Sequence, residues 1–229
     1  MKKIITIMVM FLMLFSLTAC KETDAIKFKK EYESLNYKKS DSGKKYRKVK
    51  LSRKNSFIYS DAKEISKKID NGDTFIVYFG FSKCPWCRSV ISSLDKVARD
   101  TKYEKIYYVD VLDIRDTLEV KDGKVIATKK GDKYYNKLLK QLDLVLDDYS
   151  LTDSNGKSVN TNEKRIYAPN VVAVANGKPI KLETGVSKDQ KDAYMTLTDK
   201  MQKETYNKFK CLIKCLLKES SICESKTSC

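Results

Sequence analysis

The sequence predicts an α/β domain, in which a mixed sheet is flanked by helices and carries an insertion in mid-domain and a long C-terminal helix. Three observations predict this class. Two buried strands are separated by a helix, a polar stretch follows, and a strand hairpin precedes the last helix. The composition is that of a folded chain with a core, since 41% of the 229 residues are hydrophobic and 14 are tyrosine.

The N-terminus predicts export and anchoring. Lys2 and Lys3 precede a charge-free apolar stretch, residues 4–17, that is too short to span a membrane but suits a secretory signal. The stretch ends in Leu-Thr-Ala-Cys, which resembles a bacterial lipobox. The resemblance implies that residues 1–19 are a signal peptide and that Cys20 is lipidated, which would place the chain on the extracytoplasmic face of the cell membrane, in a Gram-positive type of envelope. An ordinary signal peptide is the alternative.

Residues 20–55 are dense in lysine and arginine, and we expect a basic, lipid-anchored tether there with one short helix over residues 28–35. The whole chain has 46 basic and 30 acidic side chains, a formal charge of +16. Such charge often indicates nucleic-acid binding, but an export signal argues against that partner. Attraction to an anionic membrane or wall surface, or a merely solvated face, accounts for it instead.

The first strongly patterned elements form a strand-helix-strand unit. Asp61 is expected to cap a helix that runs to Asp70. Residues 74–81 (TFIVYFGF) are β-branched and aromatic, as in a strand covered on both faces, and residues 106–111 (IYYVDV) repeat that pattern. Between them, apolar residues recur at helical spacing, at Cys87, Val90, Ile91, Leu94, Val97 and Ala98. This is a βαβ unit with an expected right-handed crossover.

The motif Cys84-Pro85-Trp86-Cys87 lies where the first strand ends and the helix begins. The helical pattern turns Cys87 toward the core and leaves Cys84 facing solvent at the helix N-terminus. The unpaired N–H groups and positive dipole end of the helix favour a thiolate at Cys84, and Lys83 and Arg88 add positive charge. The arrangement predicts an attacking thiol, Cys84, and a resolving thiol, Cys87.

A Cys-x-x-Cys pair is also half of a zinc site, and isolated pairs can be inert structural disulfides. Zinc needs four ligands, whereas the chain has no histidine and its other mature cysteines lie beyond residue 210. A proline just inside the helix start also favours the redox interpretation. We therefore predict redox chemistry without a metal or cofactor, and a structural disulfide remains the alternative.

The remainder of the chain is patterned less regularly until residue 168. A small hairpin is expected over residues 118–127, a helix over residues 132–146, and a polar, turn-rich stretch over residues 150–165. A strand over residues 170–175, the turn Asn176-Gly177 and a strand over residues 178–182 form the second hairpin. A long amphipathic helix is expected from Lys188 to residue 217.

These elements together resemble the thioredoxin superfamily over residues 56–111 and 166–217, so the domain would span residues 56–217 with an insertion at about 112–165. Cys84-Pro85-Trp86-Cys87 falls on the family's active-site motif, and Pro169 falls where the family carries a cis-proline. The resemblance implies that Cys84 attacks, that Cys87 resolves the mixed disulfide, and that Pro85, Trp86, Ala168 and Pro169 help to dock an extended substrate. One departure is Tyr78, where many members have a buried aspartate.

Two functions follow. The first is a membrane-anchored thiol-disulfide oxidoreductase that acts on thiols or disulfides of exported proteins or peptides and is recycled by a membrane redox partner. Trp86 does not assign the direction of electron flow, but the lack of a histidine between the cysteines favours a mild reductant or isomerase over an extreme oxidant. The second is a binding or accessory module, because residues 78–87 resemble thioredoxin-like proteins found with bacteriocin export.

The C-terminus carries four more cysteines, Cys211, Cys215, Cys223 and Cys229, the last two in a tail over residues 218–229. Helical spacing turns Cys211 and Cys215 away from the apolar stripe, so we expect them to point outward. In an exported protein, two structural disulfides between helix and tail are expected. An auxiliary redox relay and a four-thiolate zinc site are the alternatives.

Overall fold

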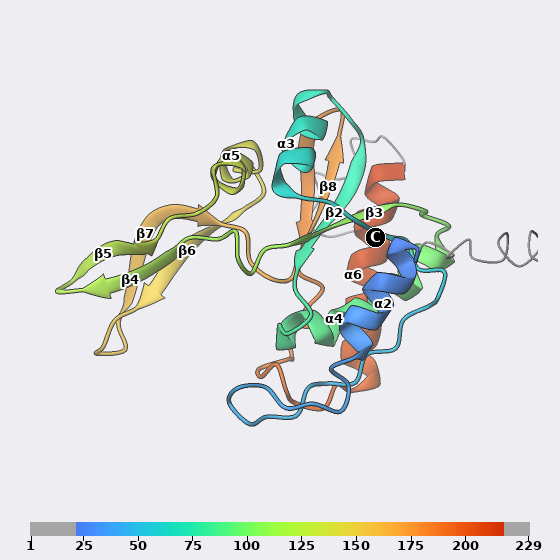
Figure 1. Cartoon of the computed structure of the whole chain (residues 1–229), viewed down its shortest axis with the longest axis horizontal. Coiled ribbons are helices and arrows are strands. Elements are labelled where there is room, and N and C mark those ends of the chain that lie inside the picture. Colours follow the sequence, from blue (N-terminus) through green and yellow to red (C-terminus); the bar gives the residue numbers. More distant parts are fainter. Residues whose placement is uncertain (1–21, 218–229) are drawn as a thin grey trace, which may run out of the picture.

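The computed structural model of the chain describes residues 22–217, and it has the predicted α/β class (Figure 1). Its central sheet has five strands in the order β1-β3-β2-β8-β9. These are β1 (Phe57–Tyr59), β2 (Phe75–Gly80), β3 (Ile106–Asp110), β8 (Asn170–Ala175) and β9 (Lys178–Glu183). Strands β1 and β2 run parallel to β3, and β8 is antiparallel to both β2 and β9. The sheet is therefore mixed, as predicted.

Helices cover both faces of this sheet (Figure 1). One face packs against α2 (Asp24–Glu33), α4 (Pro85–Asp100) and α6 (Asp199–Leu217), and the other against α3 (Ala62–Asp70) and α5 (Lys133–Gln141). Successive side chains of a strand point to opposite faces. Thus Ile76 and Tyr78 of β2 belong to the first hydrophobic core, whereas Phe75, Val77 and Phe79 belong to the second.

Two hairpins project from the body of the molecule between β3 and β8 (Figure 1). The first pairs β4 (Thr117–Lys121) with β5 (Lys124–Lys129) around the predicted turn, and the second pairs β6 (Asp147–Thr152) with β7 (Ser158–Arg165). The second hairpin is absent from the sequence prediction, because its strands have few apolar side chains to alternate. Helix α5 lies between the hairpins in sequence and completes the second core through Tyr135 and Leu138, so the insertion is partly structural.

The expectation that residues 20–55 are only a tether is wrong for the part that the structure describes. Phe28 and Tyr32 of α2 are fully buried, and Val49 and Leu51 after it are 2% and 4% exposed. The reason is visible in the spacing. Residues four apart on a helix share a face, and the alternation of Val49 and Leu51 with lysines is that of an extended segment with one side buried.

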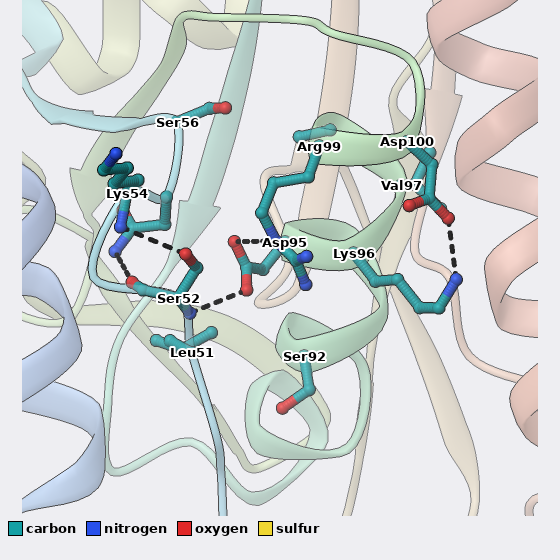
Figure 2. Close-up of polar contacts among 12 residues, drawn as sticks. Leu51, Ser52, Lys54, Ser56, Ser92, Asp95, Lys96, Val97, Arg99 and Asp100 are labelled. Atoms are coloured by element: carbon teal, nitrogen blue, oxygen red, sulfur yellow. Dashed lines mark hydrogen bonds and ion pairs between the residues drawn. The ribbon is translucent and has the colours of Figure 1, made fainter.

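Hydrogen bonds between side chains and backbone fix this N-terminal segment, both on α4 and within itself. Figure 2 shows the buried carboxylate of Asp95, which accepts a hydrogen bond from the backbone N–H of Ser52 at 2.9 Å and lies 3.5 Å from the Arg99 guanidinium. Farther along, Asn36 bonds both the N–H and the C=O of Val49, at 2.7 and 2.8 Å. Residues 22–55 are therefore part of the domain, and the domain boundary predicted at residue 56 is corrected to include them.

The last helix also begins later than predicted, at Asp199 rather than near Lys188. Side chains hold residues 187–198 in a loop. The Glu204 carboxylate accepts hydrogen bonds from the Ser187 hydroxyl at 2.6 Å and from the Lys188 backbone N–H at 3.2 Å. The Arg47 guanidinium, from the N-terminal segment, donates to backbone carbonyls of this loop. These contacts bond backbone groups of Lys188, Ala193 and Met195 outside a helix.

Candidate active site

Cys84 is the N-cap residue of α4, directly after the loop that leaves β2. Its backbone is extended, with φ −69° and ψ 117°, and Pro85 occupies the first turn of the helix, where a missing N–H costs no hydrogen bond. The backbone N–H of Cys87 donates to the Cys84 Sγ at 3.2 Å. The sulfur thus takes the place of the oxygen acceptor that usually caps a helix.

Both cysteines of the motif are free thiols, and both are buried. Cys87 is fully buried, as expected, but Cys84 is only 4% exposed, so the expectation that it faces solvent is wrong. The segment before β8 covers it, since the Cys84 Sγ donates to the backbone carbonyl of Ala168 at 3.3 Å. The pair therefore lies beneath a rim formed by the loop at Ala168.

The environment drives the pKa values of the two thiols apart. Hydrogen bonds from the side chain of Cys87, and then from the backbone N–H groups of Cys87 and Trp86, lower the pKa of Cys84 against the opposing effect of burial. Burial, together with the neighbouring Cys84, raises the pKa of Cys87 well above its usual value. Cys84 is therefore the thiol that ionises first, which is the asymmetry that the sequence predicted.

The cation that lowers the pKa of Cys84 is Arg115, a residue that the sequence analysis missed. Arg115 follows β3 and lies over the ring of Phe81, 5.4 Å from its centroid. Arg88, which was expected to act on the thiolate, is instead 1% exposed and donates five hydrogen bonds to oxygens of the N-terminal segment and the active-site loop. The position of Arg88 in the sequence, one residue after Cys87, did not indicate that it would bind these oxygens.

The predicted docking residues lie around the thiols. The Ala168-Pro169 peptide bond is cis, as predicted, and the Ala168 carbonyl lies against Cys84. Pro85 and Trp86 are half-buried at the N-terminus of α4, and Trp86 packs at the edge of the first core. The structure therefore brings together Cys84, Cys87, Pro85, Trp86 and Ala168-Pro169.

Two buried tyrosines lie under the motif, and the sequence analysis recognised only one of them as notable. The Tyr78 hydroxyl of β2 lies 2.8 Å from the Tyr32 hydroxyl of α2, and hydrogen bonding from the Tyr78 side chain lowers the pKa of Cys87. Burial raises the pKa of both phenols well above the usual value, so both carry their protons. Tyr32 was missed because its segment was interpreted as a tether.

The remaining predicted site residues lie at the ends of the chain. Cys211 and Cys215 of α6 are disulfide-bonded, whereas Cys20, Cys223 and Cys229 lie outside the described residues, so lipidation and the pairing remain predictions. Cys215 is buried and Cys211 half-buried, and their predicted orientation away from the apolar stripe stays a prediction. Helix α6 packs against β9, from which Lys181 donates to the Cys211 Sγ at 3.2 Å.

Within residues 22–217, no group of three or more potential ligand side chains is placed to hold a metal ion. In the same part of the chain, no helix combines the length and apolar character that a membrane span requires. No protein-family model matches the chain, and a search of curated proteins finds no significant match. The function is therefore argued from the site alone.

Proposed function

We propose that this protein is a thiol-disulfide oxidoreductase with a thioredoxin-like fold, which exchanges disulfides with exported proteins or peptides through Cys84 and Cys87. The observation that carries the proposal is the unequal pair of free thiols at the start of α4, one with a lowered pKa and one with a raised pKa. A structural disulfide does not require two thiols with different pKa values. An exchange catalyst does, because it needs an attacking thiolate and a resolving thiol that stays protonated.

The thioredoxin-like assignment is supported by the strand order and by the position of the motif. The motif follows a central strand, β2, and the cis-Pro169 loop precedes the neighbouring antiparallel strand, β8, so both reach the same end of the sheet. An extended client segment next to Ala168 would bring its sulfur close to Cys84, which bonds that carbonyl. Trp86 and Pro85 offer apolar contact beside it.

The reaction then runs in two steps. The Cys84 thiolate attacks a client disulfide, which forms a mixed disulfide and releases one client thiolate. Cys87 next loses its proton and attacks the Cys84 sulfur, which releases the second client thiol with that proton and leaves a disulfide between Cys84 and Cys87. Two electrons pass to the client, and the reverse sequence oxidises a client dithiol.

Replacing Cys87 with serine tests this proposal and the predicted anchor together. The first step should proceed and the second should be blocked, so cells that express the Cys87→Ser chain should accumulate mixed-disulfide adducts that a reductant dissolves. With Cys20 lipidated, the adducts should be recovered in the membrane fraction, and adding Cys20→Ala should remove them from it.

The matched control is Cys84→Ser with Cys87 intact, which should trap nothing because the attacking thiol is gone. If Cys87→Ser and wild type capture equally few partners, the oxidoreductase proposal fails and a binding or accessory module for an exported peptide takes its place. If the adducts stay with the membrane after Cys20→Ala, the lipid anchor is refuted.

A further inference from the structure

The hydroxyls of Tyr32 and Tyr78 form a buried polar pair below the redox motif. They lie 2.8 Å apart, and each side chain is fully buried. They come from distant parts of the chain, Tyr32 from α2 and Tyr78 from the centre of β2. A buried pair of phenols has two hydrogens to place, and only one of them can lie between the two oxygens. The other must find a separate acceptor.

The geometry of β2 directs the Tyr78 hydroxyl toward the active-site end of the sheet. Its ring lies back over Gly80, the last residue of the strand, so closely that a Cβ added at Gly80 would lie 2.3 Å from the hydroxyl oxygen. Cys87 packs on this same face of the sheet, within the same core, and hydrogen bonding from the Tyr78 side chain lowers its pKa. Glycine at position 80 thus leaves room for the Tyr78 hydroxyl on the face of the sheet that carries Cys87.

We propose that Tyr78 is a catalytic residue that donates a hydrogen bond to the Cys87 sulfur as it becomes a thiolate, and that Tyr32 is a positioning residue that donates its own hydrogen to the Tyr78 oxygen. When Tyr32 donates to the Tyr78 oxygen and Tyr78 donates to the Cys87 sulfur, both phenol hydrogens take part in a hydrogen bond. The Tyr78 hydroxyl then points toward the reacting sulfur. The inference rests on the proposed exchange reaction and assigns the N-terminal helix a part in its second step.

The second step needs this help because Cys87 is buried. The Cys87 S–H bond must break before its sulfur attacks the Cys84 sulfur of the mixed disulfide, and the proton leaves with the departing client thiol. Burial opposes the charged thiolate, and a buried charge requires hydrogen-bond donors. Tyr78 keeps its own proton throughout, because burial raises its pKa, and acts only as a donor.

Few other charged or titratable groups surround this pair. Cys84 neighbours Cys87 directly, and the ring of Tyr108 stacks on that of Tyr78, with centroids 5.6 Å apart. The Tyr108 hydroxyl is engaged elsewhere, since it donates to Glu31 at 3.0 Å. Arg88 is bound to backbone carbonyls and Asn36. Hydrogen bonding from the Tyr78 side chain, and to a lesser extent from the Phe81 backbone, lowers the pKa of Cys87, so Tyr78 is the side-chain donor among these neighbours.

A chromogenic aromatic disulfide, 5,5′-dithiobis(2-nitrobenzoate), separates the two steps. Mixed in equal amount with the reduced full chain in detergent, it should release one coloured thiolate when Cys84 attacks and a second when Cys87 resolves the adduct. Stopped-flow absorbance resolves these phases, and a Cys84→Ser, Cys87→Ser double variant gives the background. Tyr78→Phe should leave the first phase within about twofold of wild type and slow the second about tenfold, because a hydrogen bond to a charged group is lost.

The pH profile of the second phase distinguishes hydrogen bonding from packing. Tyr78→Phe should shift its midpoint upward by about one pH unit, and Tyr32→Phe should shift it in the same direction by less. Tyr108→Phe is the matched control, since it removes a buried hydroxyl from the same aromatic stack but not from the Tyr32 and Tyr78 pair. It should behave as wild type.

An unchanged second phase in Tyr78→Phe, or an equal slowing in Tyr108→Phe, would overturn the inference while the first phase still supports the exchange reaction. Absence of a fast first phase in wild type would instead count against the proposed function itself. Should Tyr78→Phe fold poorly, 3-fluorotyrosine placed at position 78 keeps the ring and makes the phenol more acidic. The second-phase midpoint should then move to lower pH, and an unmoved midpoint would overturn the proposal.

Discussion

The difference between Cys84 and Cys87 arises from their places in one helical turn. Cys84 caps α4 and receives the backbone N–H of Cys87, so its charge is stabilised. Cys87 lies one turn farther on, on the face that packs against the sheet, where a charge is costly. Because two residues separate the cysteines, one helix, α4, gives its two thiols different pKa values.

Arg88 shows what single residues contribute to the frame of the site. Its guanidinium bonds the carbonyls of Tyr32, Arg47 and Ser82 and the side chain of Asn36, at 2.7 to 3.2 Å. These oxygens belong to the N-terminal segment and to the loop before Cys84. One planar cation with five N–H donors satisfies all of them, which an ammonium group cannot do.

We accordingly expect Arg88→Lys to lower the free energy of unfolding by about 2 to 3 kcal/mol, because buried carbonyls lose their donors. Denaturant unfolding monitored by circular dichroism measures this change. Arg99→Lys on the same helix is the control and should stay within about 0.5 kcal/mol, since the Arg99 side chain is 45% exposed. Equal stability of Arg88→Lys and wild type would contradict the structural role.

At the scale of elements, helix α2 joins the N-terminal segment to the first core. The Phe28 ring stacks on Phe57 with centroids 4.1 Å apart and meets Tyr108 edge-on at 4.8 Å. Tyr32, one turn later, reaches the hydroxyl of Tyr78. The segment thus packs on β1, β2 and β3 on the same face of the sheet as α4, and it brings Tyr32 to the candidate site.

Phe28→Ala tests whether this segment is integral to the domain. It should reduce the free energy of unfolding by about 3 to 5 kcal/mol, the usual cost of removing a buried aromatic ring. Tyr37→Ala, in the same segment but 86% exposed, should change it by less than about 0.5 kcal/mol. Urea titration of both variants gives the comparison. A similar small effect at both positions would support the interpretation of this segment as a tether outside the domain.

The elements that sequence patterns predicted well are those with strong periodicity. The strand at residues 170–175 was predicted with its observed bounds, and β2 and β3 to within one residue at each end. Elements held by side-chain contacts from distant residues were not predictable. The loop over residues 187–198 depends on Arg47 and Glu204, and helical periodicity alone does not reveal such contacts.

The residues of the candidate site were also predictable only where the local sequence pattern or motif fixes their positions. The motif identified Cys84 and Cys87, and the resemblance identified Ala168-Pro169, because their positions are fixed by adjacent strands. Arg115 carries no local signal, because tertiary packing alone brings it to Cys84. The spacing of Phe28 and Tyr32 indicates a buried helix face, but not that Tyr32 meets Tyr78. Burial of Cys84 was equally hidden, because the residue that covers it is 84 positions away.

At the scale of the whole molecule, the sheet brings three distant segments to one end. Tyr32 of α2 reaches Tyr78 below the motif, and the Ala168 carbonyl before β8 contacts Cys84. The hairpin insertion leaves and re-enters the sheet between β3 and β8 (Figure 1). Both ends of the insertion are thus close to the edge where β2 ends, since β2 pairs with β3 and β8. The fold places the reactive pair among segments that only tertiary structure unites.

The central claim is that the two thiols of this site are chemically unequal. Alkylation of the reduced protein with iodoacetamide across a range of pH, with each cysteine followed by mass spectrometry, tests it most directly. Because the lowered pKa lets Cys84 ionise first, its modification should rise with pH below the ~8.5 of a free thiol, while Cys87 stays protected until well above it. Equal rates for the two cysteines, or faster modification of Cys87, would contradict the account.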